Sequence, residues 1–139
     1  DGTTNLDVVD IDGAVDMAST LDVAGTLTVQ GGITEDAVTL TGTSTTIDLA
    51  TATNFVHDLT GATTYTFSNP SSTGNATAFT LKIIQDSTAR AITWPSSVDW
   101  AGGTAPTLSS ADNAVDVFVF YTIDGGTTYY GFTAGQAMA

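Results

Sequence analysis

Apolar residues in the first third of the chain occur in pairs separated by one residue, and these pairs recur every six residues. The pairs begin at positions 15, 21 and 27, Ile33 continues the period, and small residues fill the gaps. Spacing of i, i+2 is typical of one face of a very short strand, and the 3.6-residue spacing of a helix is absent. The apolar residues of this repeat segment, residues 15–33, are Val15, Met17, Leu21, Val23, Leu27, Val29 and Ile33.

A fixed short period predicts a solenoid or a fibre, and the length of the repeat segment decides between them. A single-chain β-helix made of hexads needs roughly three hexads for each turn and about three stacked units for stability. The repeat segment supplies about one turn, so one copy cannot bury its own apolar pairs, whereas three copies around a common axis can. We therefore predict a homotrimeric β-prism or triple β-helix with the seven residues above as its core. A flexible arm without regular structure is the alternative.

From about residue 51 the apolar alternation is longer and aromatic residues appear. The strongest alternation runs from Val115 to Ile123, which predicts a central strand covered on both faces, followed by a hairpin turn at residues 124–126. Shorter strands with one inward face are predicted around Phe55, His57 and Leu59, around Tyr65 and Phe67, and around Phe79, Leu81 and Ile83. The predicted fold is all-β, with a fibrous stalk at residues 1–50 and an antiparallel β-sandwich or jelly-roll-like domain at residues 51–139.

The charge of the chain is strongly acidic. Fifteen acidic residues stand against two basic ones, Lys82 and Arg90, which gives a net charge of −13. Phosphate groups would be repelled, so we expect no nucleic-acid partner and no anionic membrane partner. The longest apolar run, residues 117–121, is too short for membrane insertion. Because eight of the acids lie in the first 36 residues, assembly of the stalk is predicted to depend on salt or calcium.

The residue types that carry catalysis are scarce. The chain has no cysteine, one histidine and no Gly-x-Ser-x-Gly motif, and its one glutamate, Glu35, lies in the predicted stalk. His57 alternates with apolar residues and is predicted to be a half-buried, hydrogen-bonded core histidine. These observations predict no enzymatic activity and no cofactor. Asp10, Asp12 and Asp16 are the candidate metal ligands, although they lack the third alternating ligand and the terminal Glu of a calcium-binding loop.

Aromatic residues gather towards the C-terminal half of the chain. Trp94 and Tyr121 fall on strand faces that are predicted to be buried. Trp100 and Tyr130 do not, so they are the predicted contacts with a host-surface glycan or another partner, because aromatic rings stack on sugars. Aromatic side chains are also common in cores and subunit interfaces, and that alternative stays open for both residues.

Two segments resemble segments that recur in bacteriophage tail-fibre and virion-appendage proteins. They are residues 92–106, ITWPSSVDWAGGTAP, and residues 116–131, DVFVFYTIDGGTTYYG, and the closing Ala134-Gly135-Gln136 is similar to the usual end of such proteins. The resemblance covers about residues 76–137. It implies a location on the virion surface, a homotrimer, contacts with other virion proteins and no cofactor, and it supplies no catalytic residue. Asp99 stands where lysine is common, so a partner at that position would differ in charge.

The sequence therefore predicts a non-enzymatic structural subunit of a phage appendage, a tail fibre or a head fibre, that trimerises through its stalk. Two alternatives remain. One is a capsid cement protein that reinforces the shell, and the other is a carbohydrate-binding adhesin tip.

Overall fold

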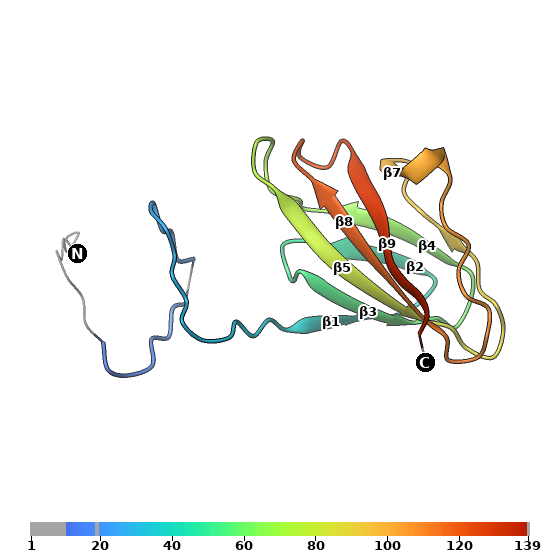
Figure 1. Cartoon of the computed structure of the whole chain (residues 1–139), viewed down its shortest axis with the longest axis horizontal. Helices are drawn as coiled ribbons and strands as arrows, with labels where there is room; N and C mark the ends of the chain where they lie inside the picture. The colour runs from blue at the N-terminus through green and yellow to red at the C-terminus, as the bar shows by residue number, and fades with distance from the viewer. Residues whose placement is uncertain (1–10, 19, 139) are drawn as a thin grey trace. The chain divides into compact units, whose positions relative to one another are not determined.

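The computed structural model describes residues 11–18 and 20–138, and the chain divides into two units (Figure 1). The first unit is Asp1–Ile33 and contains the repeat segment. The second unit is Thr34–Ala139, which we call the head.

The first unit has no strand or helix in its described residues, 11–18 and 20–33. The strands predicted for the repeat segment are therefore not formed in the single chain. Isolated two-residue apolar pairs cannot form a sheet alone, because a strand needs hydrogen-bonding neighbours and a covered face.

The head is all-β, as predicted, and its strands form two sheets, a larger mixed one and a smaller parallel one. The larger sheet has six strands in the order β1-β3-β5-β8-β9-β7, and the smaller has three in the order β2-β4-β6. The bounds of the elements are β1 Ala37–Leu40, β2 Ser44–Asp48, β3 Asn54–Asp58, β4 Thr63–Ser68, β5 Thr77–Ile84, β6 Ile92–Thr93, β7 Val98–Trp100, the 3-10 helix η1 Ala101–Gly103, β8 Val115–Thr122 and β9 Tyr129–Met138.

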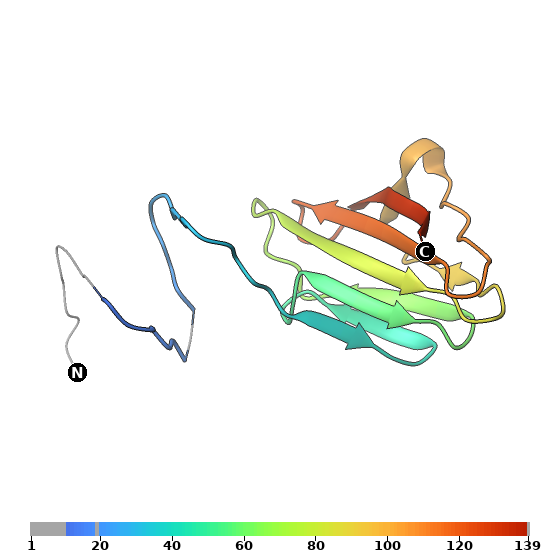
Figure 2. The ribbon, with the colours of Figure 1, turned by 60° about the horizontal axis from the view of Figure 1, so that its bottom comes forward.

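The first six strands alternate between the two sheets, so the chain winds through three coils. In the larger sheet β1, β3 and β5 are parallel neighbours, with Val38 opposite Phe55 and Phe55 opposite Leu81. In the smaller sheet β2, β4 and β6 are parallel neighbours. Figure 2 shows the arrows of β1, β3 and β5 pointing the same way and that of β8 pointing the opposite way. Two sheets are consistent with the predicted β-sandwich. The predicted antiparallel pairing is wrong for β1 to β6, because successive coils place equivalent strands side by side in parallel.

The head begins closer to the N-terminus than predicted, because the first coil includes β1 and β2. β1 and β2 lie within the predicted stalk, residues 1–50, yet they pair with β3 and β4. The boundary between the two units is at Ile33 and Thr34 rather than near residue 50. The apolar pair of β1, Val38 and Leu40, has the same spacing as the pairs of the repeat segment. The spacing alone therefore did not distinguish β1 from the repeat segment.

Antiparallel pairing is confined to β5, β8 and β9 of the larger sheet, because the edge strand β7 pairs with β9 in parallel. β8 pairs with β5 on one side and with β9 on the other, and the predicted hairpin turn joins β8 to β9. Gly125 and Gly126 have φ values of +71° and +81°, a conformation that glycine adopts without steric cost. The Asp124 carboxylate accepts hydrogen bonds from the Thr122 hydroxyl at 2.9 Å and the Thr128 backbone N–H at 3.0 Å. These contacts fix the turn.

The core lies between the inner faces of the two sheets. Phe67 of the smaller sheet meets Phe79 and Phe120 of the larger one with ring centroids 5.0 and 5.2 Å apart. β8 is central, as predicted, but its two faces differ. Its even positions, Phe118 and Phe120 among them, are buried, whereas its odd positions are only half-buried. The odd positions face outward, away from the smaller sheet.

Candidate functional site

The predicted trimer core is uncovered in the single chain. The seven apolar side chains at 15, 17, 21, 23, 27, 29 and 33 are between 41% and 71% exposed. An exposed Leu is ordinary on a protein surface, but a periodic series of seven within 19 residues is not. The repeat segment is therefore a candidate interaction surface.

The candidate metal ligands do not form a centre in the described residues. Asp12 and Asp16 are exposed, and residues 11–18 and 20–138 contain no group of three or more His, Cys, Asp or Glu placed to hold an ion. Asp10 lies outside the described residues.

Trp100 is not the exposed aromatic that the sequence predicted. It is 8% exposed, because β7 directs it to the inner face of the larger sheet. Its ring lies 5.3 Å from that of Trp94 and 5.9 Å from that of Phe118, centroid to centroid. Trp100 is opposite Gly131 on β9, and a Cβ at Gly131 would lie 2.7 Å from the Trp100 ring. Gly131 thus leaves the space that the indole fills.

Tyr130 is exposed, as predicted, on the opposite face of the same sheet. It is 46% exposed, and Phe132, two positions along β9, is 55% exposed. The sequence analysis missed Phe132, although its i, i+2 spacing from Tyr130 could have shown it. We call the outward side chains of β5, β8 and β9 around these two the outer patch, which consists of Lys82, Val117, Val119, Tyr121, Tyr130 and Phe132.

A shallow hollow of about 390 Å³ adjoins the outer patch where η1 meets β9. Tyr130 and Phe132 form one side of it, Gly102 and Gly103 form the other, and Asp99 contributes a carboxylate. The structure thus brings the neighbourhoods of Trp100 and Tyr130 together, with Asp99 directly opposite Tyr130 in register.

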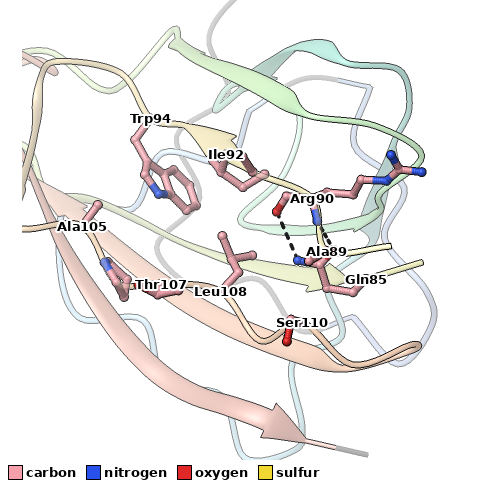
Figure 3. A pocket seen from close by; sticks show the side chains of 11 residues that line it. Gln85, Ala89, Arg90, Ile92, Trp94, Ala105, Thr107, Leu108 and Ser110 are labelled. Carbon is pink, nitrogen blue, oxygen red and sulfur yellow. Dashed lines mark hydrogen bonds between the residues drawn. The ribbon is translucent and has the colours of Figure 1, made fainter. Parts of the chain in front are cut away.

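A second hollow, of about 370 Å³, lies between β6 and the segment 104–110 (Figure 3). Its walls are mainly apolar and include Ile92, Trp94 and Leu108. The Arg90 backbone closes one end, since its N–H donates to Gln85 Oε1 at 3.0 Å and its carbonyl accepts from Gln85 Nε2 at 3.3 Å.

Arg90 is the one ionisable residue among those lining this second hollow, and its charge is already paired. The guanidinium points away from the hollow (Figure 3) and contacts the Asp86 carboxylate at 2.7 Å. The hydrogen bond from Arg90 lowers the pKa of Asp86, and the same bond raises the pKa of Arg90. The hollow therefore offers apolar contact and no free acid or base.

His57 is a core histidine, and it is more deeply buried than predicted. It is 0% exposed, and its Nδ1 lies 2.7 Å from the Tyr65 hydroxyl, while its Nε2 has no hydrogen-bond partner. Burial lowers the pKa of His57, and the backbone at Gly42 and the charge of Asp58 oppose that shift only in part. Burial likewise raises the pKa of Tyr65. The pair is neutral and serves packing.

We expect this histidine to make the head less stable in mild acid. Its folded pKa is below the ordinary value of about 6.5, so the unfolded chain binds a proton first as the pH falls. The free energy of unfolding should therefore fall below about pH 6.5 and level off once the pH has passed the folded pKa. Urea melts between pH 7 and 5 measure this.

The same melts on a His57→Phe variant provide the control. The carboxylates whose pKa values are lowered by hydrogen bonds, Asp48, Asp86 and Asp124, lose their contribution only below about pH 4, outside this window. His57 is the only histidine in the chain, so the slope should vanish in the variant. A slope of equal size in both proteins would contradict the assignment.

Asp116 is a buried carboxylate that the sequence analysis did not single out. It lies on the inward side of β8 with Phe118 and Phe120 and is 1% exposed. Its oxygens accept hydrogen bonds from the Ser109 N–H and hydroxyl, both at 2.7 Å, and from the Ala137 N–H at 3.0 Å. The available signal was its position in the alternation, because Asp116 falls on the same side of the strand as Phe118 and Phe120. Asp116 fixes the segment before β8 to the end of β9.

We expect Asp116→Ala to lower the free energy of unfolding by about 2–3 kcal/mol, because it leaves these buried donors without an acceptor. Asp112→Ala removes the same charge from an exposed position nearby and should change stability by less than about 0.5 kcal/mol. Chemical denaturation of both variants tests this, and equal midpoints would refute a structural role for Asp116.

Comparison of the chain with protein families, curated proteins and solved structures gives no match. The fold defines the class as an all-β protein with one mixed and one parallel sheet, and the repeat segment and the outer patch are its candidate interaction surfaces. In the described part of the chain, no helix has the length and apolar composition that crossing a bilayer requires.

Proposed function

We propose that the chain is a non-enzymatic structural subunit of a bacteriophage appendage, a tail fibre or head fibre on the virion surface, that assembles as a homotrimer through its repeat segment. The observation that carries the proposal is the series of seven exposed apolar side chains at six-residue spacing. Three copies wound together can bury this series, whereas one copy cannot. The resemblance of residues 92–106 and 116–131 to phage appendage segments supports the virion location.

The chemistry of the head is compatible with a structural role. Three of its buried polar residues, His57, Gln85 and Asp116, contact other parts of the head. The carbohydrate-binding alternative rested on Trp100 and Tyr130 as surface contacts, and Trp100 is buried. Nothing in the head favours the capsid-cement alternative over a fibre. We therefore propose the fibre subunit alone.

Hydrogen exchange tests the proposal within the repeat segment itself. In a trimeric β-fibre the amides of residues 20–33 would pair between chains and should exchange at least about 100-fold more slowly than unstructured amides. Peptides from β5 and β8, which pair within the head, are the internal reference for full protection. Exchange of residues 20–33 at the rate of an unstructured chain would contradict the proposal.

A further inference from the structure

We infer that the outer patch is the surface through which neighbouring heads of one assembly contact each other. This inference rests on the proposed homotrimer and adds to it a second, head-to-head interface. The occupant of the patch is another copy of the same head.

The patch consists of neighbouring, mainly apolar positions on three adjacent strands. On β9, Tyr130 and Phe132 lie opposite Tyr121 and Val119 of β8, and on the other side Val117 of β8 lies opposite Lys82 of β5. The two aromatic rings are about half exposed. Contiguous apolar surface of this kind is a mark of protein–protein contact, in contrast to single scattered apolar side chains.

The charges on this face favour a copy of the chain as the partner. The outward positions of β5, β8 and β9 carry no carboxylate, in a chain of net charge −13. Two such chains repel each other less through a face without carboxylates than through one that carries them. It also holds Lys82, the only lysine in the chain.

Lys82 makes no ion pair among the described residues, in which the one salt bridge joins Arg90 to Asp86. Carboxylates lie around the patch: Glu35 precedes β1, Asp58 ends β3 and Asp99 is on the edge strand β7. A second head, offset across the patch, would bring one of these carboxylates to Lys82. Charge complementarity of this kind sets the register of an interface.

The short connection between the repeat segment and the head keeps the heads of one trimer close to one another. Residues 34–36 join Ile33 to β1, and the four residue steps from Ile33 to Ala37 span at most about 14 Å. Heads tethered this closely have an effective concentration in the millimolar range, so a patch of modest affinity is occupied.

The single lysine makes a sharp cross-linking test possible. A water-soluble carbodiimide joins an amine to a carboxylate that touches it, and Lys82 carries the chain's one side-chain amine. Copies of the 139-residue chain labelled with ¹⁴N and with ¹⁵N are mixed, unfolded and refolded together. The mixture is treated with the carbodiimide and boiled in detergent. It is then digested with chymotrypsin, and the peptides are analysed by mass spectrometry. We expect covalent dimers and trimers, with mixed-isotope peptides joining Lys82 to Glu35, Asp58 or Asp99.

Two variants are the controls. Lys82→Arg keeps the charge but removes the reactive amine, so these links should disappear while the mass of the assembly is unchanged. The double variant Val119→Ser with Phe132→Ser removes apolar contact from the patch. It should reduce the yield of Lys82 links at least ten-fold while the repeat segment still holds the assembly together.

The outcomes separate this inference from the proposed function. A trimer whose Lys82 links are absent or confined within one chain would overturn the head-to-head interface and leave the proposed trimer standing. A trimer in which the double variant keeps its full yield of links would also overturn the interface. A monomeric wild-type chain would overturn both.

Discussion

Replacing Leu27 with Asp should reduce the molecular mass of the assembly to that of one chain. Leu27 is 62% exposed in the single chain, and in the proposed homotrimer it is buried on the axis of three copies. The substitution would bring three carboxylates together in a desolvated space, at a cost on the order of several kcal/mol for each charge. A β-fibre core of short apolar pairs cannot compensate for a loss of this size.

Thr28→Asp is the matched control for this substitution. It adds the same charge one position along, on the side of the predicted strand that faces solvent in the assembly. The control should keep the mass of the unaltered protein at moderate ionic strength. If Leu27→Asp and Thr28→Asp have the same mass, the alternation of the repeat segment does not define an interior.

Trp100→Ala should lower the free energy of unfolding of the head by about 3–5 kcal/mol, the usual cost of removing a buried aromatic side chain. The indole is surrounded by Trp94, Phe118 and Phe120 and lies against Gly131. Because glycine has no side chain, Gly131 cannot fill the cavity that the substitution creates. Urea unfolding, followed by the fluorescence of the remaining Trp94, measures the loss.

Ser96→Ala, at an exposed position in the same segment, should stay within about 0.5 kcal/mol of the unaltered protein. If Trp100→Ala is no less stable than this control, Trp100 does not belong to the core. The expected loss has a practical consequence for glycan-binding assays. A Trp100 variant that fails to bind would report a damaged fold, so Tyr130 is the residue to replace in such an assay.

The local alternation of the chain predicted the inward faces well. Phe55, His57 and Leu59 are buried together, as are Phe79, Leu81 and Ile83. Such a face depends only on the two-residue period of a strand. The hairpin turn at residues 124–126 was also predicted from local sequence alone, because its glycines adopt the positive φ that the turn requires.

The partners of the strands could not be predicted in the same way. A period of two says which side of a strand is apolar but not which strand lies beside it, so the parallel coils of β1 to β6 were predicted as an antiparallel sandwich. Trp100 was misplaced for the same reason. Its burial depends on Gly131, which is 31 residues away in the sequence and directly opposite in register.

The outer patch is intermediate between these cases. The sequence predicted that Tyr130 is exposed, and the i, i+2 spacing of Phe132 placed it on the same face. Lys82 belongs to the outer patch only because β5, β8 and β9 are neighbours in the sheet, which the sequence did not predict. The repeat segment is the opposite case. Its period is evident in the sequence, and its proposed burial in a homotrimer is a property that one chain cannot display.

The mass of the purified 139-residue chain, measured by light scattering at moderate ionic strength, tests the proposed homotrimer most directly. One chain has a mass of 14.2 kDa. A homotrimer would have three times that mass, and we expect this value without dependence on protein concentration in the micromolar range. A mass equal to that of one chain would contradict it.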